Sequence, residues 1–339
     1  MQNIDAKPRN LIGIVLIALF LGPMALMLWL GRWRAALLYV LASLAALGLL
    51  FAFIAISSFR PFAKLGLVDA FSIIVLTLSV IGLVHAIRIR KSALRRPWYS
   101  RWYVVLPAQL VTAIALMLSV RTFLYQPFNM PSASMSPTLK VGDYFYVSKL
   151  SYGYSRYSFI SSITVSNKTL VSCCAFDFPG RVILADTPKR GDVAVFKLPS
   201  NTEFDYVKRV IGLPGDRIQM RDGVLFINGE EVKKERIEDY VDTEAGGEGG
   251  GHAIQQFEET LPNGVKYRVL DQVPNGSADN TIEYVVPPAH YFMMGDNRDN
   301  SEDSRFLDAV GYVPEENFVG PVVLRFWTRK GFGLEIWPE

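Results

Sequence analysis

The chain has 339 residues, half of them hydrophobic, and its mean hydropathy is positive. It is therefore too apolar for an ordinary soluble protein of this length. The formal net charge is only +3, and the basic residues that stand out lie beside apolar runs. We therefore expect contact with lipid headgroups and no nucleic-acid partner.

Four long apolar runs predict a membrane anchor at residues 1–120. Each run approaches or reaches the ~20 residues that cross a bilayer core. The first run contains Gly22-Pro23, which either kinks a helix or turns the chain back, so three and four crossings both fit. A removable leader is disfavoured because another long run follows closely. The runs are Leu11 to Leu30, Ala35 to Ile56, Leu67 to Ile87 and Tyr103 to Val120.

The loop between the third and fourth runs predicts the orientation of the anchor. Clusters of Arg and Lys beside membrane helices belong on the cytoplasmic side. The fourth run then carries the chain outward, so everything after residue 120 should face the periplasm or an equivalent space. The basic residues of this loop are Arg88, Arg90, Lys91, Arg95, Arg96 and Arg101.

From residue 121 onward, short runs of β-branched and aromatic residues alternate with Gly, Pro, Asp and Asn. This pattern is typical of strands joined by turns. Asp222-Gly223 and Asn228-Gly229 predict hairpin turns. We expect a mainly antiparallel β domain over residues 121–339, with residues 231–287 as a probable second lobe and 246–251 as its flexible, glycine-rich tip.

The only two cysteines, Cys173 and Cys174, are adjacent and lie in an insertion at residues 154–187. A disulfide between neighbours is geometrically awkward. Free thiols, a strained vicinal bond and a distal partner all stay open.

The segment Met130 to Leu139 is a serine-rich turn that follows closely on the last apolar run. A serine hydroxyl becomes a nucleophile only when a neighbouring base takes its proton. The three histidines lie far apart, which argues against a metal site. His85 lies in an apolar run and His252 in the glycine-rich tip, which leaves His290 as the one histidine candidate, without a distinctive motif around it.

Lys208 is the better candidate base. It lies beside Arg209 in a strand-like run, and strand alternation sends the two side chains to opposite faces. If Lys208 faces inward, burial lowers its pKa enough for a neutral amine to accept the serine proton. The alternative is a lysine that extends to solvent.

Several motifs together resemble the type I signal peptidases, also called leader peptidases. They occur in one order over residues 121–325, and the membrane half matches only in general plan. The motifs are Met130 to Leu139, Val141 to Val147, Pro188 to Phe196, Tyr206 to Asp216 and Gly295 to Arg305.

The resemblance implies a Ser/Lys dyad, with Ser134 as nucleophile and Lys208 as general base. Ser132 and the backbone N–H of Ser134 would form the oxyanion hole, and Ser301 would orient the lysine. Two charged pairs would support the site, Asp303 with Arg305 and Asp296 with Arg209. The walls of shallow apolar substrate pockets map to Phe128, Met130, Pro131, Met135, Leu139, Tyr206 and Val207.

The implied protein is a signal-peptidase-like enzyme of the bacterial inner membrane, with multi-pass membrane helices and a periplasmic catalytic domain of two β lobes. It would remove signal peptides from exported preproteins after small-x-small motifs, without a cofactor or a metal. The implied partners are preprotein signal peptides, membrane lipid and the translocation machinery. An inactive relative that binds signal peptides is the alternative, and a self-cleaving regulator is disfavoured by the membrane half.

Overall fold

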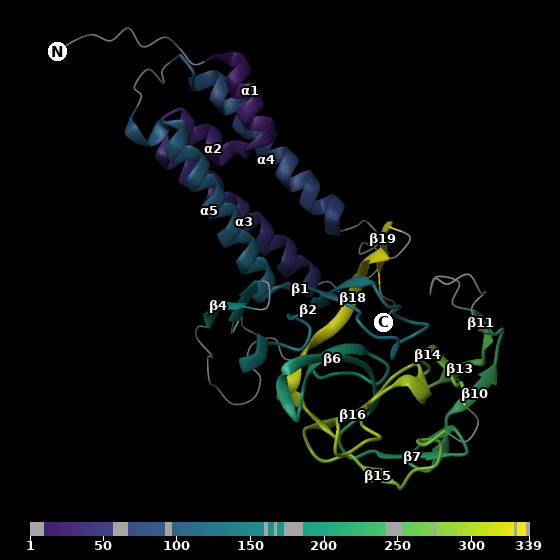
Figure 1. Cartoon of the computed structure of the whole chain (residues 1–339). Helices are drawn as coiled ribbons and strands as arrows, with labels where there is room; N and C mark the ends of the chain where they lie inside the picture. Colours follow the sequence, from purple (N-terminus) through teal and green to yellow (C-terminus); the bar gives the residue numbers. More distant parts are fainter. Residues whose placement is uncertain are drawn as a thin grey trace. The chain divides into compact units, whose positions relative to one another are not determined.

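The computed structural model describes residues 10–56, 67–91, 97–158, 162–165, 168–172, 186–241, 253–273, 276–328 and 331–336. The chain divides into two compact units, residues 1–119 and 120–339. Cys173, Cys174, His252 and the glycine-rich tip 246–251 lie outside the described residues. Figure 1 shows helices in the first unit and strands in the second.

The first apolar run is two short helices, α1 (Leu11–Phe20) and α2 (Gly22–Trp29). Gly22 joins them with φ 78°, a left-handed conformation that glycine adopts without strain. The chain turns back at Gly22, so that the two helices lie side by side. The evidence is that a Cβ built on Gly13, in α1, would lie 3.2 Å from the indole of Trp29 at the far end of α2. Helices of 10 and 8 residues are about 15 and 12 Å long, well short of a bilayer core of ~30 Å. Of the two alternatives for Gly22-Pro23, the turn is therefore the one observed.

Three longer helices follow, α3 (Trp33–Ile56), α4 (Leu67–Ile89) and α5 (Trp102–Phe123), with a 3₁₀ turn at Trp98–Ser100 before α5. Within the described ranges, one helix is long and apolar enough to cross a membrane, Trp102–Thr122. Shorter apolar helices occupy Leu11–Phe20, Trp33–Ala46 and Leu76–Ile89.

The second unit is built on an eight-stranded sheet whose order is β1-β2-β18-β5-β6-β16-β17, with β19 paired to β18. All its neighbouring strands are antiparallel, which confirms the predicted antiparallel β domain. The strands are β1 (Tyr125–Asn129), β2 (Tyr144–Ser148), β5 (Val193–Leu198), β6 (Asn201–Gly212), β16 (His290–Met294), β17 (Val313–Pro314), β18 (Phe318–Thr328) and β19 (Gly331–Ile336).

Smaller sheets form around it. β15-β7-β8-β9 is four-stranded, β10-β13-β14 is three-stranded, and β11-β12 and β3-β4 are pairs. Both predicted hairpin turns are present, and φ is positive at all four turn residues, Asp222, Gly223, Asn228 and Gly229. The bounds are β3 (Ser162–Val165), β4 (Lys168–Ser172), β7 (Arg217–Arg221), β8 (Val224–Ile227), β9 (Glu230–Glu231), β10 (Lys233–Arg236), β11 (Tyr240–Val241), β12 (Ala253–Ile254), β13 (Gln256–Thr260), β14 (Lys266–Leu270) and β15 (Tyr284–Val285).

Candidate active site

The serine turn connects β1 to β2, which pair directly with each other. Its ends are tied together because the Met130 N–H donates to the Asp143 carbonyl and the Gly142 N–H donates to the Met130 carbonyl, both at 2.8 Å. Met135 and Leu139 are fully buried in the core. These contacts fix the backbone of the turn around Ser134, which is itself only 6% exposed.

Lys208 reaches this turn from β6, where it lies opposite Ala194 of β5. Its Nζ is 2.6 Å from Oγ of Ser134, and its side chain is buried rather than extended to solvent. Burial lowers the pKa of Lys208 from 10.5 to about 8, the nearby charge of Asp303 raises it, and that of Arg305 lowers it further. A buried amine with this pKa is partly neutral near physiological pH and can accept a proton from the hydroxyl it contacts.

Ser132 lies on the exposed side of the same turn. Its Oγ is 3.2 Å from Oγ of Ser134. A hydroxyl at this distance can reach an oxygen atom that is bonded to a carbon under attack by Ser134.

Asp303 is the centre of a buried cluster beside Lys208. It accepts hydrogen bonds from Oγ of Ser301 at 2.8 Å, from the Gly295 N–H at 2.9 Å and from Nε of Arg305 at 2.8 Å. Burial raises the pKa of the Asp303 carboxyl, but the charge and hydrogen bonds of Arg305, the Gly295 N–H and the charge of Lys208 together lower it below its usual value. Among the described contacts, Ser301 bonds to Asp303 and has no hydrogen bond to Lys208.

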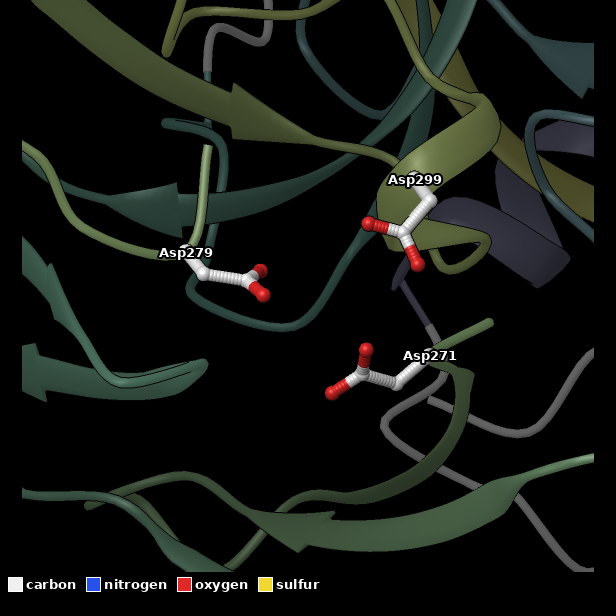
Figure 2. A group of neighbouring side chains, drawn as sticks. All are labelled: Asp271, Asp279 and Asp299. Atoms are coloured by element: carbon white, nitrogen blue, oxygen red, sulfur yellow. The ribbon is translucent and has the colours of Figure 1, made fainter. Parts of the chain in front are cut away.

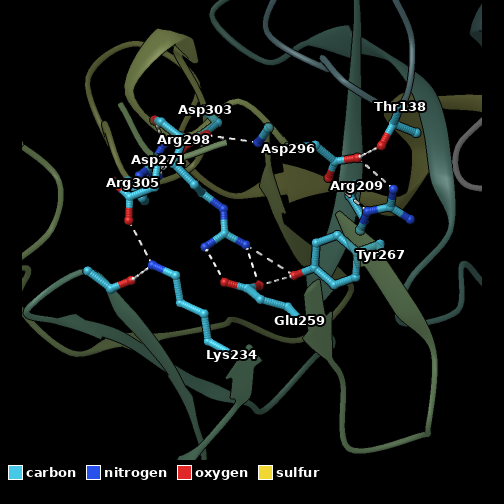
Figure 3. A network of polar contacts seen from close by, with 12 residues as sticks. Thr138, Arg209, Lys234, Glu259, Tyr267, Asp271, Asp296, Arg298, Asp303 and Arg305 are labelled. Atoms are coloured by element: carbon cyan, nitrogen blue, oxygen red, sulfur yellow. Dashed lines mark hydrogen bonds and ion pairs between the residues drawn. The ribbon is translucent and has the colours of Figure 1, made fainter. Parts of the chain in front are cut away.

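Arg209 and Asp296 form a second buried ion pair (Figure 3). Nε and an Nη of Arg209 donate to the two carboxylate oxygens of Asp296 at 2.8 and 2.6 Å. Thr138, from the end of the serine turn, donates its hydroxyl to the same carboxylate at 2.5 Å. The pair therefore ties β6 to the serine turn one residue away from Lys208.

The expected pocket residues divide into two groups. Phe128, Met130, Met135, Leu139 and Val207 pack in one apolar cluster, together with Phe145, Val147, Val193, Val195, Val319 and Val322. The structure does not bring the other two into this cluster. Tyr206 packs instead beside Phe196 and donates its hydroxyl to Glu302 at 3.3 Å, and Pro131 is exposed.

The sequence prediction missed Asn297. Its backbone N–H donates to the carbonyl of Ser134 and its side-chain amide to the carbonyl of Ala133, both at 3.1 Å. It also missed the buried pair of Glu259 with Arg298, in which the two side chains make hydrogen bonds of 2.9 and 2.6 Å. Asn297 and Arg298 lie within the motif Gly295 to Arg305, whereas Glu259 has no motif around it.

Neither described histidine contacts the serine turn. Nδ1 of His290 lies 2.8 Å from the carbonyl of Pro288, and Nδ1 of His85 lies 3.2 Å from the hydroxyl of Tyr39 in the helical unit. These contacts leave Lys208 as the basic side chain in contact with Ser134 among the described residues.

Three carboxylates outside this site, Asp271, Asp279 and Asp299, have oxygen atoms within 4.8 Å of one another (Figure 2). Each already has a partner. Lys234 pairs with Asp271 at 2.7 Å, the Gly276 N–H donates to Asp279 at 2.6 Å, and backbone amides donate to Asp299. This grouping alone therefore does not indicate a metal ion.

The sequence model of the family described as signal peptidase, peptidase S26, matches residues 101–327. A signal peptidase I of Rickettsia conorii is 37% identical over 225 residues, which cover 64% of this chain and 77% of that relative. A signal peptidase I of Rickettsia typhi is 37% identical over 231 residues, covering 66% and 80%. A crystal structure of a signal peptidase I from Enterococcus faecalis is 28% identical, covers 40% of this chain and 97% of that chain, and has a TM-score of 0.24.

The antiparallel β domain, its buried serine and these matches define a hydrolase of the serine protease class. Within that class, the chain belongs to the signal peptidase family, peptidase S26, and its relatives are bacterial type I signal peptidases. The family predicted from the motifs is thereby confirmed.

Proposed function

We propose that this chain removes N-terminal signal peptides from exported preproteins, with Ser134 as nucleophile and Lys208 as general base. The observation that carries the proposal is the 2.6 Å contact between Oγ of Ser134 and Nζ of Lys208. Both side chains are at least nine-tenths buried. Because water is largely excluded there, the amine of Lys208 is well placed to take the proton of the hydroxyl.

In the first chemical step, Oγ of Ser134 attacks the carbonyl carbon of the scissile bond and its proton passes to Nζ of Lys208. The carbon–nitrogen bond then breaks, and Lys208 returns the proton to the leaving amine. The product is an ester between Ser134 and the signal peptide. A water molecule, deprotonated by Lys208, hydrolyses this ester and regenerates the serine.

We assign the stabilisation of the oxyanion to the hydroxyl of Ser132 and the backbone N–H of Ser134. The contact of 3.2 Å between the two hydroxyls supports this assignment. Negative charge on the former carbonyl oxygen exists only after the attack, so a donor that waits there favours the transition state over the bound substrate.

We also propose cleavage after small-x-small motifs, which the apolar cluster beside the serine supports. Met135 and Leu139 are fully buried, so the partly buried Phe128 and Val207 are the members of this cluster that would form a shallow wall, which a large substrate side chain would overlap. The extended substrate would add main-chain hydrogen bonds along strand edges near Ser134.

The same proposal gives the chain a multi-pass anchor in a bacterial cytoplasmic membrane, with the β unit on the periplasmic side. It is supported by the apolar helix Trp102–Thr122 and by the basic residues between residues 88 and 101. Its proposed partners there are preproteins, lipid and the translocation machinery.

The test is cleavage of a preprotein with an Ala-x-Ala site by the full-length protein in detergent micelles. Ser134→Ala and Lys208→Ala should each lower kcat by about three orders of magnitude or more. Ser136→Ala is a matched control in the same turn and should keep its activity. Cleavage that survives either of the first two substitutions would exclude the proposed dyad.

A further inference from the structure

Strands β13 and β14, which lie within the predicted second lobe at residues 231–287 and are called the lobe below, contact the motif Gly295 to Arg305 through a buried charged group (Figure 3). Both oxygens of Glu259, on β13, accept hydrogen bonds from Arg298 at 2.9 and 2.6 Å. Tyr267, opposite Glu259 on β14, donates its hydroxyl to Glu259 at 2.5 Å and accepts from Arg298 at 3.1 Å. Glu259 is completely buried, and Arg298 is 3% exposed.

Residues at the end of β14 also make hydrogen bonds to the residues of this motif on either side of Arg298. The Leu270 N–H donates to the carbonyl of Asp296 at 2.8 Å, and the side chain of Gln272 donates to that of Asn297 at 2.9 Å. The backbone amide of Gln272 also donates to Asp299 at 2.6 Å. The lobe therefore fixes consecutive residues of the motif, on both sides of Arg298.

The other side of the motif contacts the backbone of the serine turn and the charged groups beside Lys208. Asn297, next to Arg298, donates to the carbonyls of Ser134 and Ala133. The carbonyl of Arg298 accepts from Arg305 at 2.5 Å, and Arg305 pairs with Asp303. Any shift of Arg298 would thus be passed to the Ser134 backbone and to the charge beside Lys208.

The buried, bidentate ion pair of Glu259 with Arg298 allows Arg298 very little movement. Its hydrogen bonds define both the direction and the distance of the guanidinium group, and a buried charge that loses its partner is strongly destabilised. The ring of Tyr267 also lies against the guanidinium of Arg209, 4.3 Å from its carbon to the ring centre. Tyr267 therefore contacts Arg209, the residue next to Lys208, as well as Arg298.

We propose that Glu259 and Tyr267 are positioning residues for signal-peptide cleavage. By fixing Arg298, they hold Asn297 against the serine turn and so set the distance between Oγ of Ser134 and Nζ of Lys208. This inference rests on the proposed function and gives the second lobe a role in the reaction.

The expected defect is in kcat rather than in KM. Neither Glu259 nor Tyr267 belongs to the apolar cluster of Met135 and Leu139 that we assign to substrate binding. A misplacement of ~1 Å between reacting groups can cost about 10²-fold in rate. Substrate should therefore bind normally and react slowly.

The experiment compares Glu259→Gln and Tyr267→Phe with Glu258→Gln in the full-length protein, at a temperature far below unfolding. Glu258 is the neighbouring residue on β13, and it pairs with Lys266 at the surface at 3.1 Å, so it is a matched control. Glu259→Gln should lower kcat by at least about tenfold and Tyr267→Phe by roughly three- to tenfold, with KM within about twofold. Glu258→Gln should leave both unchanged.

A second measurement separates positioning from stability. The rate at which a serine-directed acylating reagent modifies Ser134 should fall in parallel with kcat, and amide hydrogen exchange of residues 133–139 should become faster. A merely structural role would lower the unfolding temperature without changing either quantity in the folded protein. Folded variants with wild-type kcat, or with the loss entirely in KM, would overturn the inference.

Tyr267→Phe keeps the test decisive even if Glu259→Gln does not fold, because it removes one hydroxyl and retains the ring. Wild-type kcat in that variant contradicts the inference. If Ser134→Ala is inactive while Glu259→Gln is fully active, the inference is wrong and the proposed function stands. If Ser134→Ala is active, the proposed function itself fails.

Discussion

Gly295 lies so close to Ser134 that a Cβ built on it would be 2.6 Å from the Ser134 carbonyl oxygen. The same Cβ would lie 2.2 Å from Oγ of Ser301. The motif that carries Asp296 and Asn297 can therefore pack against the serine turn only because residue 295 has no side chain.

Gly295→Ala should for this reason lower kcat by about 10²-fold or more, because the added methyl must displace the backbone of Ser134. Gly333→Ala is the matched control, since a Cβ there has nothing within 4 Å. The measurement is steady-state cleavage of an Ala-x-Ala preprotein by both variants. Equal activity of the two would show that the turn can move without loss of the reaction.

Ser132 should act through its hydroxyl alone. Ser132→Ala should lower kcat by about 10²-fold with little change in KM, the usual effect of losing one oxyanion donor. Ser132→Thr retains a hydroxyl at the same position and should recover much of this loss. A Ser132→Ala variant with full kcat would remove Ser132 from the oxyanion hole, because its side chain is otherwise exposed.

The pH dependence of cleavage should follow the protonation of Lys208. Burial lowers its pKa to about 8, so only roughly a tenth of the enzyme carries a neutral amine at pH 7. The value of kcat/KM should therefore rise with pH and level off roughly one unit above this pKa. Lys208→Arg should be inactive at every pH tested, because a guanidinium does not lose its proton in this range. A flat profile between about pH 6 and 9 would exclude this base.

Much of the site was predictable because its residues lie in short motifs near strand ends. Ser134 and Lys208 are 74 residues apart, and the order of the motifs related them without any knowledge of contacts. Strand alternation separated Lys208 from Arg209 but did not show which of them faces inward. Both are buried, because they lie in the last part of β6, residues 208–212, where successive side chains on both faces of the strand are covered.

Glu259 could not be predicted in this way. Glu258 and Glu259 are neighbours of the same type on one strand, yet one pairs with Lys266 at the surface and the other is fully buried against Arg298. The difference comes from which face of β13 meets the motif Gly295 to Arg305, and this is set by tertiary packing. The turn at Gly22 was equally ambiguous, since a glycine followed by proline fits both a kink and a reversal.

Asp303 should be required for stability as well as for activity. Asp303→Ala would leave the buried guanidinium of Arg305 without its carboxylate, a change that typically costs 3–5 kcal/mol, so we expect a loss of about this size. Glu302→Ala changes the preceding residue, which is exposed, and should cost less than about 1 kcal/mol. Urea unfolding of the detergent-solubilised protein, followed by tryptophan fluorescence, measures both. An Asp303→Ala protein as stable as Glu302→Ala would show that Arg305 finds another partner.

Lys208 should in contrast reduce the stability of the folded protein at neutral pH. Its pKa is about 8 in the folded protein and 10.5 as the ordinary value, so the unfolded chain holds the proton more tightly. The cost of burying the charged amine is therefore present in full below pH 8 and disappears as the pH rises towards 10.5. A shift of this size corresponds to at most roughly 3 kcal/mol, from which the lost hydrogen bond to Ser134 must be subtracted.

Lys208→Met should accordingly be more stable than the wild type by about 1–2 kcal/mol at pH 7 and should lose this advantage near pH 10. The measurement is urea unfolding of both proteins at pH 7 and near pH 10. The variant should also have no catalytic activity. Lys197→Met is the control, because Lys197 pairs with Asp205 at 3.0 Å on a partly exposed part of β5 and should show no such gain at pH 7. If Lys208→Met is instead less stable than the wild type at pH 7, the charged amine does not destabilise the folded protein. The explanation of the low pKa of Lys208 by burial would then be wrong.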